Sequence, residues 1–284
     1  MISQTQYSQD LPQLRKDLES VILQAQGVFA VSVIDVSSGR TLEINAGERF
    51  HAASTMKTPV MIEVFRQAEE GRFRLDDSIL VRNEFKSIVD GSTFQLDLGD
   101  DSDDSMYKRI GGKATICELV HQMITVSSNL ATNILIELVD AKKVTARMRN
   151  LGATEIEVLR GVEDGKAFEK GLNNSTTSHD LAILFHALAR AKAADSASCK
   201  AMIDILLEQK FKDKIPALLP SDVRVAHKTG NIQGVEHDSG IVFLPDGRAY
   251  VLAILSKNLR ESGVGKSTIA RISKMVYDSF MLMK

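Results

Sequence analysis

Ser54 and Lys57 lie three residues apart, where a loop runs into a predicted helix. Apolar residues at positions 61, 64, 65 and 68 follow at helical spacing. Residues three apart share a helix face, so Lys57 can reach the serine hydroxyl. An amine that loses its proton activates a serine, and the positive helix N-terminus favours both the neutral amine and an oxyanion at Ser54. We therefore predict that Ser54 is a nucleophile and Lys57 its base.

Ser-x-x-Lys is a weak signal by itself, because Ser105 and Lys108 have the same spacing. Two further short motifs follow it in the chain. Residues 127–129 read Ser-Ser-Asn and lie where a loop enters another predicted helix. Residues 228–230 read Lys-Thr-Gly and are expected at the end of a strand over residues 223–227. The order and structural context of the three motifs make the signal specific.

The chain resembles the serine penicillin-recognising enzymes, which comprise class A β-lactamases and penicillin-binding proteins, over residues from about 10 to the C-terminus. Their signature is Ser-x-x-Lys, Ser-Asp-Asn and Lys-Thr-Gly. Ser128 replaces the aspartate, a departure that loosens the class A assignment more than the superfamily one. The resemblance implies that Ser54 is the acylated nucleophile, that Lys57 is its base, and that Ser127 donates a proton to the leaving nitrogen. It also implies that Asn129 donates to the substrate amide, that Lys228 and Thr229 bind the substrate carboxylate, and that the strand at Gly230 lies along the substrate. The N–H groups of Ser54 and Asn231 would form the oxyanion hole.

The residue that activates the deacylating water departs from the class A pattern, Arg-x-Glu-x-x-Leu-Asn. Glu169 has the correct spacing to the Leu-Asn pair at 172–173, but Arg160 lies nine residues before it. Counting from Arg160 places a valine at the expected position, with Glu163 and Asp164 one and two residues later. We expect Glu169 to be the base, with the other two carboxylates as rivals. Since none fits both ends of the pattern, we predict that acylation is faster than deacylation.

The strand after Lys-Thr-Gly carries no arginine to help bind the substrate carboxylate, as many class A enzymes do. We expect His237, or Lys228 alone, to serve instead. The alternative for His237 is a structural pair with Asp238 at a strand edge.

Elements that position these motifs follow from hydrophobic periodicity. We predict helices over residues 10–26, 55–70, 114–125, 128–139, 142–150, 178–192, 196–210 and 266–283, and strands over 28–36, 41–45, 223–227, 236–243 and 248–256. The fold class is therefore α/β, an antiparallel sheet formed by both chain ends with flanking helices and an inserted all-helical domain. The expected sheet domain comprises residues 1–53 and 214–284, and the helical domain residues 54–213. An acidic stretch, 98–105, is expected to be a solvated loop.

Composition limits the partners. The net charge of −2 does not favour nucleic acid, and no apolar run is long enough to span a membrane. Cys117 and Cys199 form neither a disulfide framework nor a metal motif, so we expect no metal and no cofactor. Residues 1–10 lack a signal-peptide pattern. The protein is therefore either cytoplasmic or one whose signal peptide has been removed. The resemblance implies a periplasmic or secreted protein.

We predict a serine hydrolase, a class A-like β-lactamase that acts through an acyl-Ser54 ester on a small-molecule β-lactam. The first alternative is a penicillin-binding protein, either a D-alanyl-D-alanine carboxypeptidase or an esterase acting on a peptidoglycan-type substrate. The second is a non-catalytic peptidoglycan-binding module, which would not need the Lys57 and Ser127 proton relay.

Overall fold

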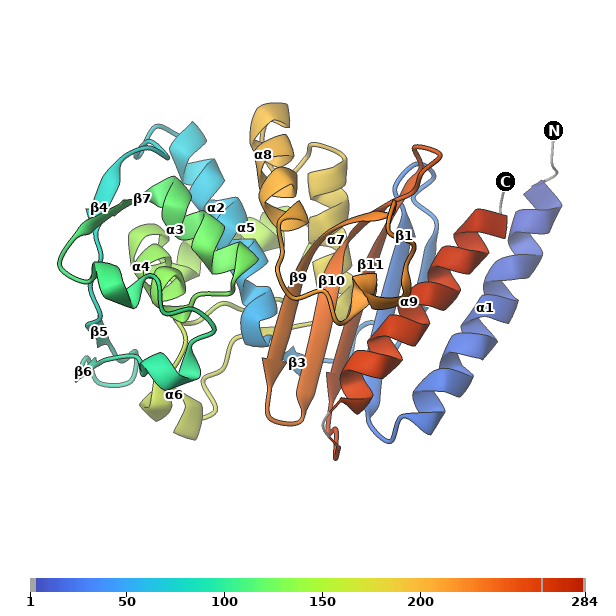
Figure 1. Cartoon of the computed structure of the whole chain (residues 1–284), viewed down its shortest axis with the longest axis horizontal. Helices are drawn as coiled ribbons and strands as arrows, with labels where there is room; N and C mark the ends of the chain where they lie inside the picture. Colours follow the sequence, from blue (N-terminus) through green and yellow to red (C-terminus); the bar gives the residue numbers. More distant parts are fainter. Residues whose placement is uncertain (1–3, 262, 283–284) are drawn as a thin grey trace.

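The centre of the fold is a five-stranded sheet to which both ends of the chain contribute (Figure 1). A computed structural model describes residues 4–261 and 263–282. Every strand pair in this sheet is antiparallel, and the register of the central pair aligns Val28 with Lys257. The predicted fold class is therefore confirmed. The strand order is β2 (Thr41–Ile44), β1 (Val28–Asp35), β11 (Ala249–Lys257), β10 (Val235–Phe243) and β9 (Arg224–Ile232).

Two terminal helices, α1 (Gln4–Gln24) and α9 (Val264–Leu282), lie side by side over one face of the sheet (Figure 1). Leu14, Leu18 and Val21 of α1 are buried there, Leu18 fully. Tyr250 of β11 stacks on Phe280 of α9 with ring centroids 4.4 Å apart. Helix α1 begins six residues before the predicted start.

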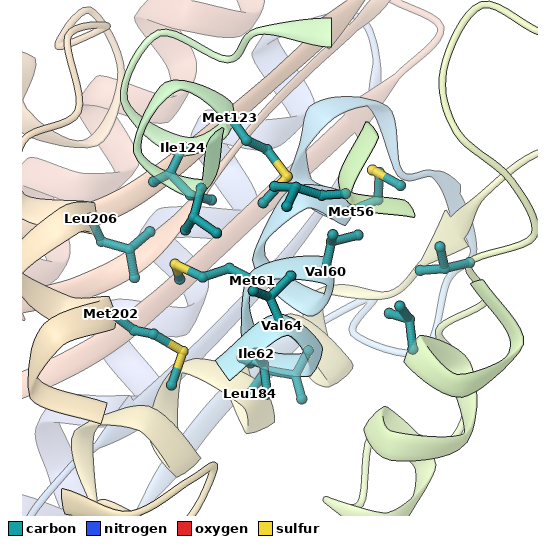
Figure 2. Close-up of a cluster of buried hydrophobic side chains, with 14 of the residues drawn as sticks. Met56, Val60, Met61, Ile62, Val64, Met123, Ile124, Leu184, Met202 and Leu206 are labelled. Atoms are coloured by element: carbon teal, nitrogen blue, oxygen red, sulfur yellow. The ribbon is translucent and has the colours of Figure 1, made fainter. Parts of the chain in front are cut away.

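Helix α2 (Lys57–Glu69) is the central helix of the remaining part of the chain. Its residues Val60, Met61, Ile62 and Val64 are fully buried, and Figure 2 shows them packed among side chains of the surrounding helices. Ten of the thirteen residues of α2 are buried, so other elements enclose it on nearly every side. Its neighbours include α3 (Ile116–Thr125), α4 (Asn129–Val139), α5 (Ala141–Asn150) and α8 (Ser196–Leu207), while α7 (Ser178–Ala189) packs on β1, β10 and β11.

One apolar core extends from the inner face of the sheet through α7 and α2 to α4 and α5. A second lies between the sheet and the two terminal helices. The division into two domains stays a prediction, and the first core crosses the proposed boundaries without interruption.

Several short elements were not anticipated from the sequence, because runs of two to five residues carry too little periodicity. They are β3 (Phe50–His51) paired with β8 (Ser175–Thr176), β4 (Ser78–Leu80) with β7 (Lys113–Thr115), β5 (Phe85–Lys86) with β6 (Thr93–Phe94), the 3₁₀ turns η1 (Ala53–Met56), η2 (Leu98–Asp100), η3 (Tyr107–Arg109) and η4 (Ile215–Leu218), and helix α6 (Gly165–Glu169).

Strand β9 is longer than predicted. We expected the strand to end at residue 227, with Lys-Thr-Gly beyond it. Instead, residues 228–230 lie inside β9, where the ladder with β10 pairs Gly230 with His237. The prediction was wrong because lysine, threonine and glycine lack the apolar alternation used to define the strand. The longer strand passes directly beside η1.

Candidate active site

Ser54 lies in the 3₁₀ turn η1, immediately before α2. The chain enters this turn through β3, and Ala53 takes a left-handed backbone conformation with φ 44°. The Ala53 N–H donates to His51 Nδ1 at 3.0 Å, which fixes the turn. A left-handed alanine is unfavourable and persists only where the surroundings hold it. The turn therefore presents Ser54 in one defined position at the start of the buried helix.

Lys57 is fully buried at the first position of α2. Its Nζ lies 2.6 Å from Ser127 O, 3.1 Å from Ser127 Oγ and 2.8 Å from Asn129 Oδ1. Burial lowers its pKa to about 7, against the opposing attraction of Asp101 and Glu163. Lys57 can therefore exchange a proton near neutral pH, and the main cause is desolvation rather than the helix end that we invoked from the sequence.

The Ser127 hydroxyl lies between two lysines. Lys228 Nζ is 3.0 Å from Ser127 Oγ, in addition to the contact from Lys57, and Lys228 is also fully buried. Burial, followed by the positive charges of Lys57 and Lys214, lowers the pKa of Lys228 well below its usual value. Ser127 has a positive φ of 60°, which turns both its carbonyl and its hydroxyl toward Lys57. This arrangement can carry a proton between Lys57 and a group bound beside Ser127.

Asn129, the first residue of α4, connects Lys57 to Glu163. Its Oδ1 accepts from Lys57, while its Nδ2 donates to Glu163 Oε1 at 2.7 Å. Glu163 is half-buried, and burial raises its pKa although the bond from Asn129 opposes this effect. Its φ of 61° is again left-handed. A carboxyl group with a raised pKa in a cavity is a candidate general base.

Two adjoining cavities meet at Ser54. The larger, about 560 Å³, lies on the side of Glu163 and Arg160. The smaller, about 280 Å³, lies on the side of Ser127 and Thr229. Ser54, Asp100, Asn129 and Asn231 line both. A bound molecule can therefore react at Ser54 while it extends in both directions.

Gly230 brings β9 close to the backbone of η1. A Cβ atom at this position would lie 3.2 Å from Ser54 N and 3.1 Å from Thr55 N. The glycine thus permits a close approach that places the strand beside the N–H group of Ser54. Thr229 is nearly buried and lines the smaller cavity, and Asn231 follows on the same strand.

Arg160 closes the loop that carries the candidate bases. It donates to the carbonyl groups of Leu172 and Gly161 and to Asn173 Oδ1, all within 3.0 Å. Asn133 holds the other side of the loop through both the N–H and the C=O of Val162. The loop is therefore anchored at Val162, and the next residue, Glu163, turns into the cavity.

The structure does not bring Glu169, our expected base, to Ser54. Residues 165–169 fold into α6, and Glu169 is the exposed last residue of this helix, outside the larger cavity. Asn173, the end of the Leu-Asn pair, binds Arg160 instead. Asp164 is buried and is engaged by Ser87 Oγ and by the N–H groups of Ile88 and Ala167. Asp164 lines the larger cavity but caps α6, and Glu169 lies outside the cavity. Glu163 is therefore the one of the three carboxylates that faces the cavity and is not a helix cap.

His237 is also not in a substrate-binding position. It is fully buried, its Nε2 lies 2.9 Å from His51 O, and its Nδ1 accepts from Ser256 N at 3.1 Å. Burial is the main cause that lowers its pKa to about 4, so it is neutral at pH 7. Nor does it pair with Asp238, which contacts His227 Nδ1 at 2.9 Å. His237 joins the sheet to the strand before Ser54.

Lys214 is a site residue that sequence reasoning missed. It is 2% exposed, lines the smaller cavity and lies 2.6 Å from Glu236 Oε2. Its Nζ also donates to the carbonyl groups of Gly230 and His237. The one sequence signal was a lysine directly before the apolar Ile215, which is hard to separate from the many surface lysines.

The acidic stretch also differs from expectation. Asp101 is only partly exposed and accepts from the N–H groups of Asn129 and Leu130 at the start of α4. Over residues 4–261 and 263–282 there is no group of three or more His, Cys, Asp or Glu side chains arranged to hold a metal ion. Within the same ranges, no helix has the length and apolar character that crossing a membrane requires.

A known protein family matches most of the chain. The model of the β-lactamase enzyme family matches residues 13–280. Among curated proteins, the chain is similar to the extended-spectrum β-lactamase PER-1 of Pseudomonas aeruginosa, with 23% identity over 94% of this chain and 87% of the relative.

Solved structures give the same result. The β-lactamase of Sphaerobacter thermophilus superposes with a TM-score of 0.81 and 28% identity, over 94% of this chain and 98% of that one. A variant of PBP-A, solved as an acyl-enzyme complex with penicillin G, superposes with a TM-score of 0.80 and 26% identity, over 95% and 97% of the two chains.

Proposed function

The chain belongs to the β-lactamase enzyme family, and we propose that it is a serine hydrolase that opens β-lactam rings through an acyl ester on Ser54. The observation that carries this proposal is a chain of hydrogen-bonded side chains beside Ser54, where the two cavities meet. It runs through Lys228, Ser127, Lys57, Asn129 and Glu163. The substrate class is supported by the relatives that are named β-lactamases and by the acyl-enzyme that a PBP-A variant forms with penicillin G.

In the acylation step, Ser54 Oγ attacks the lactam carbonyl carbon as neutral Lys57 takes its proton. The N–H groups of Ser54 and Asn231 stabilise the oxyanion. The carbon–nitrogen bond of the ring then breaks, and Ser127 gives its proton to the leaving nitrogen while it receives one from Lys57. Lys228 Nζ donates to Ser127 Oγ at 3.0 Å and so orients this hydroxyl for the transfer.

The substrate carboxylate binds in the smaller cavity. Thr229 and Ser127 offer hydroxyl groups there, and Lys214 supplies a buried cation. Lys214 comes from the segment before η4 rather than from β10, and it attracts the carboxylate by its charge, since its N–H groups already contact Glu236, Gly230 and His237. His237 has no part in this binding.

Glu163 activates the water for deacylation. Its carboxylate takes a proton from the water, whose oxygen attacks the ester carbon, and the proton then returns to Ser54 Oγ as the ester bond breaks. Lys57 and Glu163 share Asn129 as a hydrogen-bond partner, which links the acylation base to the deacylation base. The substrate therefore leaves as the ring-opened acid.

Mass spectrometry of the protein mixed with benzylpenicillin tests this proposal. We expect one added acyl mass on Ser54, followed by its loss and the appearance of ring-opened product. The Ser54→Ala variant should gain no mass. Acylation without loss would instead favour a penicillin-binding protein, which a D-alanyl-D-alanine peptide substrate would then test. No acylation of the wild type would overturn the proposal.

A further inference from the structure

We propose that Asp101 is a positioning residue for acylation, which holds the start of α4 so that Ser127 and Asn129 meet Lys57. This inference rests on the proposed function and concerns the same site. Asp101 comes from the loop after η2, about 28 residues before Asn129 in the chain, and no sequence motif connects the two.

The contacts are those of a helix cap supplied by a distant residue. The Asn129 N–H lies 3.0 and 2.8 Å from the two carboxylate oxygens of Asp101, and the Leu130 N–H donates to Oδ2 at 3.0 Å. The first N–H groups of a helix have no partner within the helix, and a carboxylate is the acceptor that the helix dipole favours. Asp101 therefore fixes the backbone of the residue whose side chain joins Lys57 to Glu163.

Ser128 explains why the carboxylate comes from elsewhere. The related motif is Ser-Asp-Asn, and here its central residue is a serine. Ser128 caps the helix by accepting from the Ala131 N–H at 3.3 Å, but it carries no charge. Its Oγ lies 3.5 Å from Asp101 Oδ2, so both side chains reach the same helix end. Asp101 thus supplies the negative charge that the motif lacks.

The same carboxylate acts on the charge balance of the site. The groups that face Lys57 are the carboxylates of Asp101 and Glu163 and the amine of Lys228, with Tyr107 facing both carboxylates. The attraction of Asp101 raises the pKa of Lys57 against the effect of burial. Removal of this charge should lower the pH at which Lys57 loses its proton.

The test is the acylation rate of Asp101→Asn with benzylpenicillin, measured by quenched-flow mass spectrometry over a range of pH. Asn keeps the shape but loses the charge and one acceptor. We expect the acylation rate of Asp101→Asn to be about tenfold to a hundredfold lower than that of wild type, typical of a small displacement in an active site. We also expect the acid limb of the pH profile to move to lower pH by about one unit. Asp104→Asn is the matched control, since Asp104 is an exposed residue of the same loop that pairs with Lys108.

The double variant Asp101→Asn with Ser128→Asp returns a carboxylate to the same helix end. It should recover most of the lost rate and move the acid limb back. An Asp101→Asn variant as fast as Asp104→Asn would overturn the inference. The inference would also be overturned if Asp101→Asn were slower but kept the wild-type pH profile, and the double variant did not recover the rate. That result would indicate a merely structural role for Asp101.

If Asp101→Asn does not fold, the double variant decides. Recovery of folding and acylation supports the role of the carboxylate, and failure to recover them overturns it. A wild type that benzylpenicillin does not acylate would overturn the proposed function itself, and with it this role, whereas an acylated wild type with an unaffected Asp101→Asn overturns this inference alone.

Discussion

Asn129 Nδ2 lies 2.7 Å from Glu163 Oε1, while the same side chain accepts from Lys57 through its Oδ1. One amide thus joins the candidate acylation base to the candidate deacylation base. Our first prediction concerns the carboxylate of Glu163, the candidate deacylation base. Glu163→Gln keeps the bond geometry but cannot take a proton, so deacylation should slow by a factor of about 10² to 10⁴ while acylation changes little.

The lifetime of the benzylpenicillin acyl-enzyme measures this effect. Glu169→Gln is the matched control, because that glutamate is exposed and lies outside the cavity. If Glu169→Gln traps the acyl-enzyme and Glu163→Gln does not, the base is Glu169, as the Leu-Asn spacing predicts. That result would contradict the role proposed for Glu163.

The second prediction concerns Lys57 and pH. Its pKa of about 7 means that the neutral, proton-accepting form grows as pH rises through neutrality. The acylation rate should therefore increase with pH up to a plateau above pH 7. Lys57→Arg, whose guanidinium stays charged, should slow acylation by about 10² or more and lose this dependence. A rate within about threefold of wild type would remove Lys57 from the mechanism.

The third prediction concerns the close approach of β9. In Gly230→Ala the added Cβ would meet the backbone at Ser54 N and Thr55 N, and the strand must move away. Acylation should fall by about tenfold or more, as expected for a displaced oxyanion donor. Gly47→Ala is the control, since its Cβ would contact nothing within 4 Å. Equal rates for both variants would show that the approach has no catalytic effect.

The fourth prediction concerns Lys214. Lys214→Gln removes the buried cation from the smaller cavity, so KM for benzylpenicillin should rise by about tenfold, equivalent to about 1.4 kcal/mol. A matched β-lactam whose carboxylate is esterified should show little change in KM. A similar loss for both substrates would mean that the variant disturbs Glu236 and the strands rather than carboxylate binding.

The fifth prediction concerns His237 and stability. Its folded pKa of about 4 lies below the ordinary 6.5, so between these values the unfolded chain binds more protons than the folded one. Its contribution to the free energy of unfolding is therefore complete above pH 6.5 and is lost as pH falls toward 4, by about 3 kcal/mol. The gap between the free energies of unfolding of wild type and His237→Gln, measured with urea, should narrow as the pH falls. The KM of the variant should be nearly unchanged at pH 7. A gap that stays constant with pH would contradict the neutral, buried histidine.

The sequence alone determined the elements and motifs that depend on local spacing. Ser54 and Lys57 were correctly placed at the start of a helix because helical periodicity is a pattern of neighbouring residues. The apolar alternation of the terminal strands likewise predicted a sheet formed from both chain ends, and β1 does pair with β11.

The tertiary structure alone decided which polar side chains reach Ser54. Glu163 and Glu169 are six residues apart on one loop, and only its folding into α6 turns the first inward and the second outward. His237 is withdrawn by contacts to distant backbone, while Lys214 and Asp101 come from segments without any motif. The position of the loop depends on hydrogen bonds of Arg160, Asn133 and Asp164 to partners 12, 29 and 77 residues away, which no local pattern encodes.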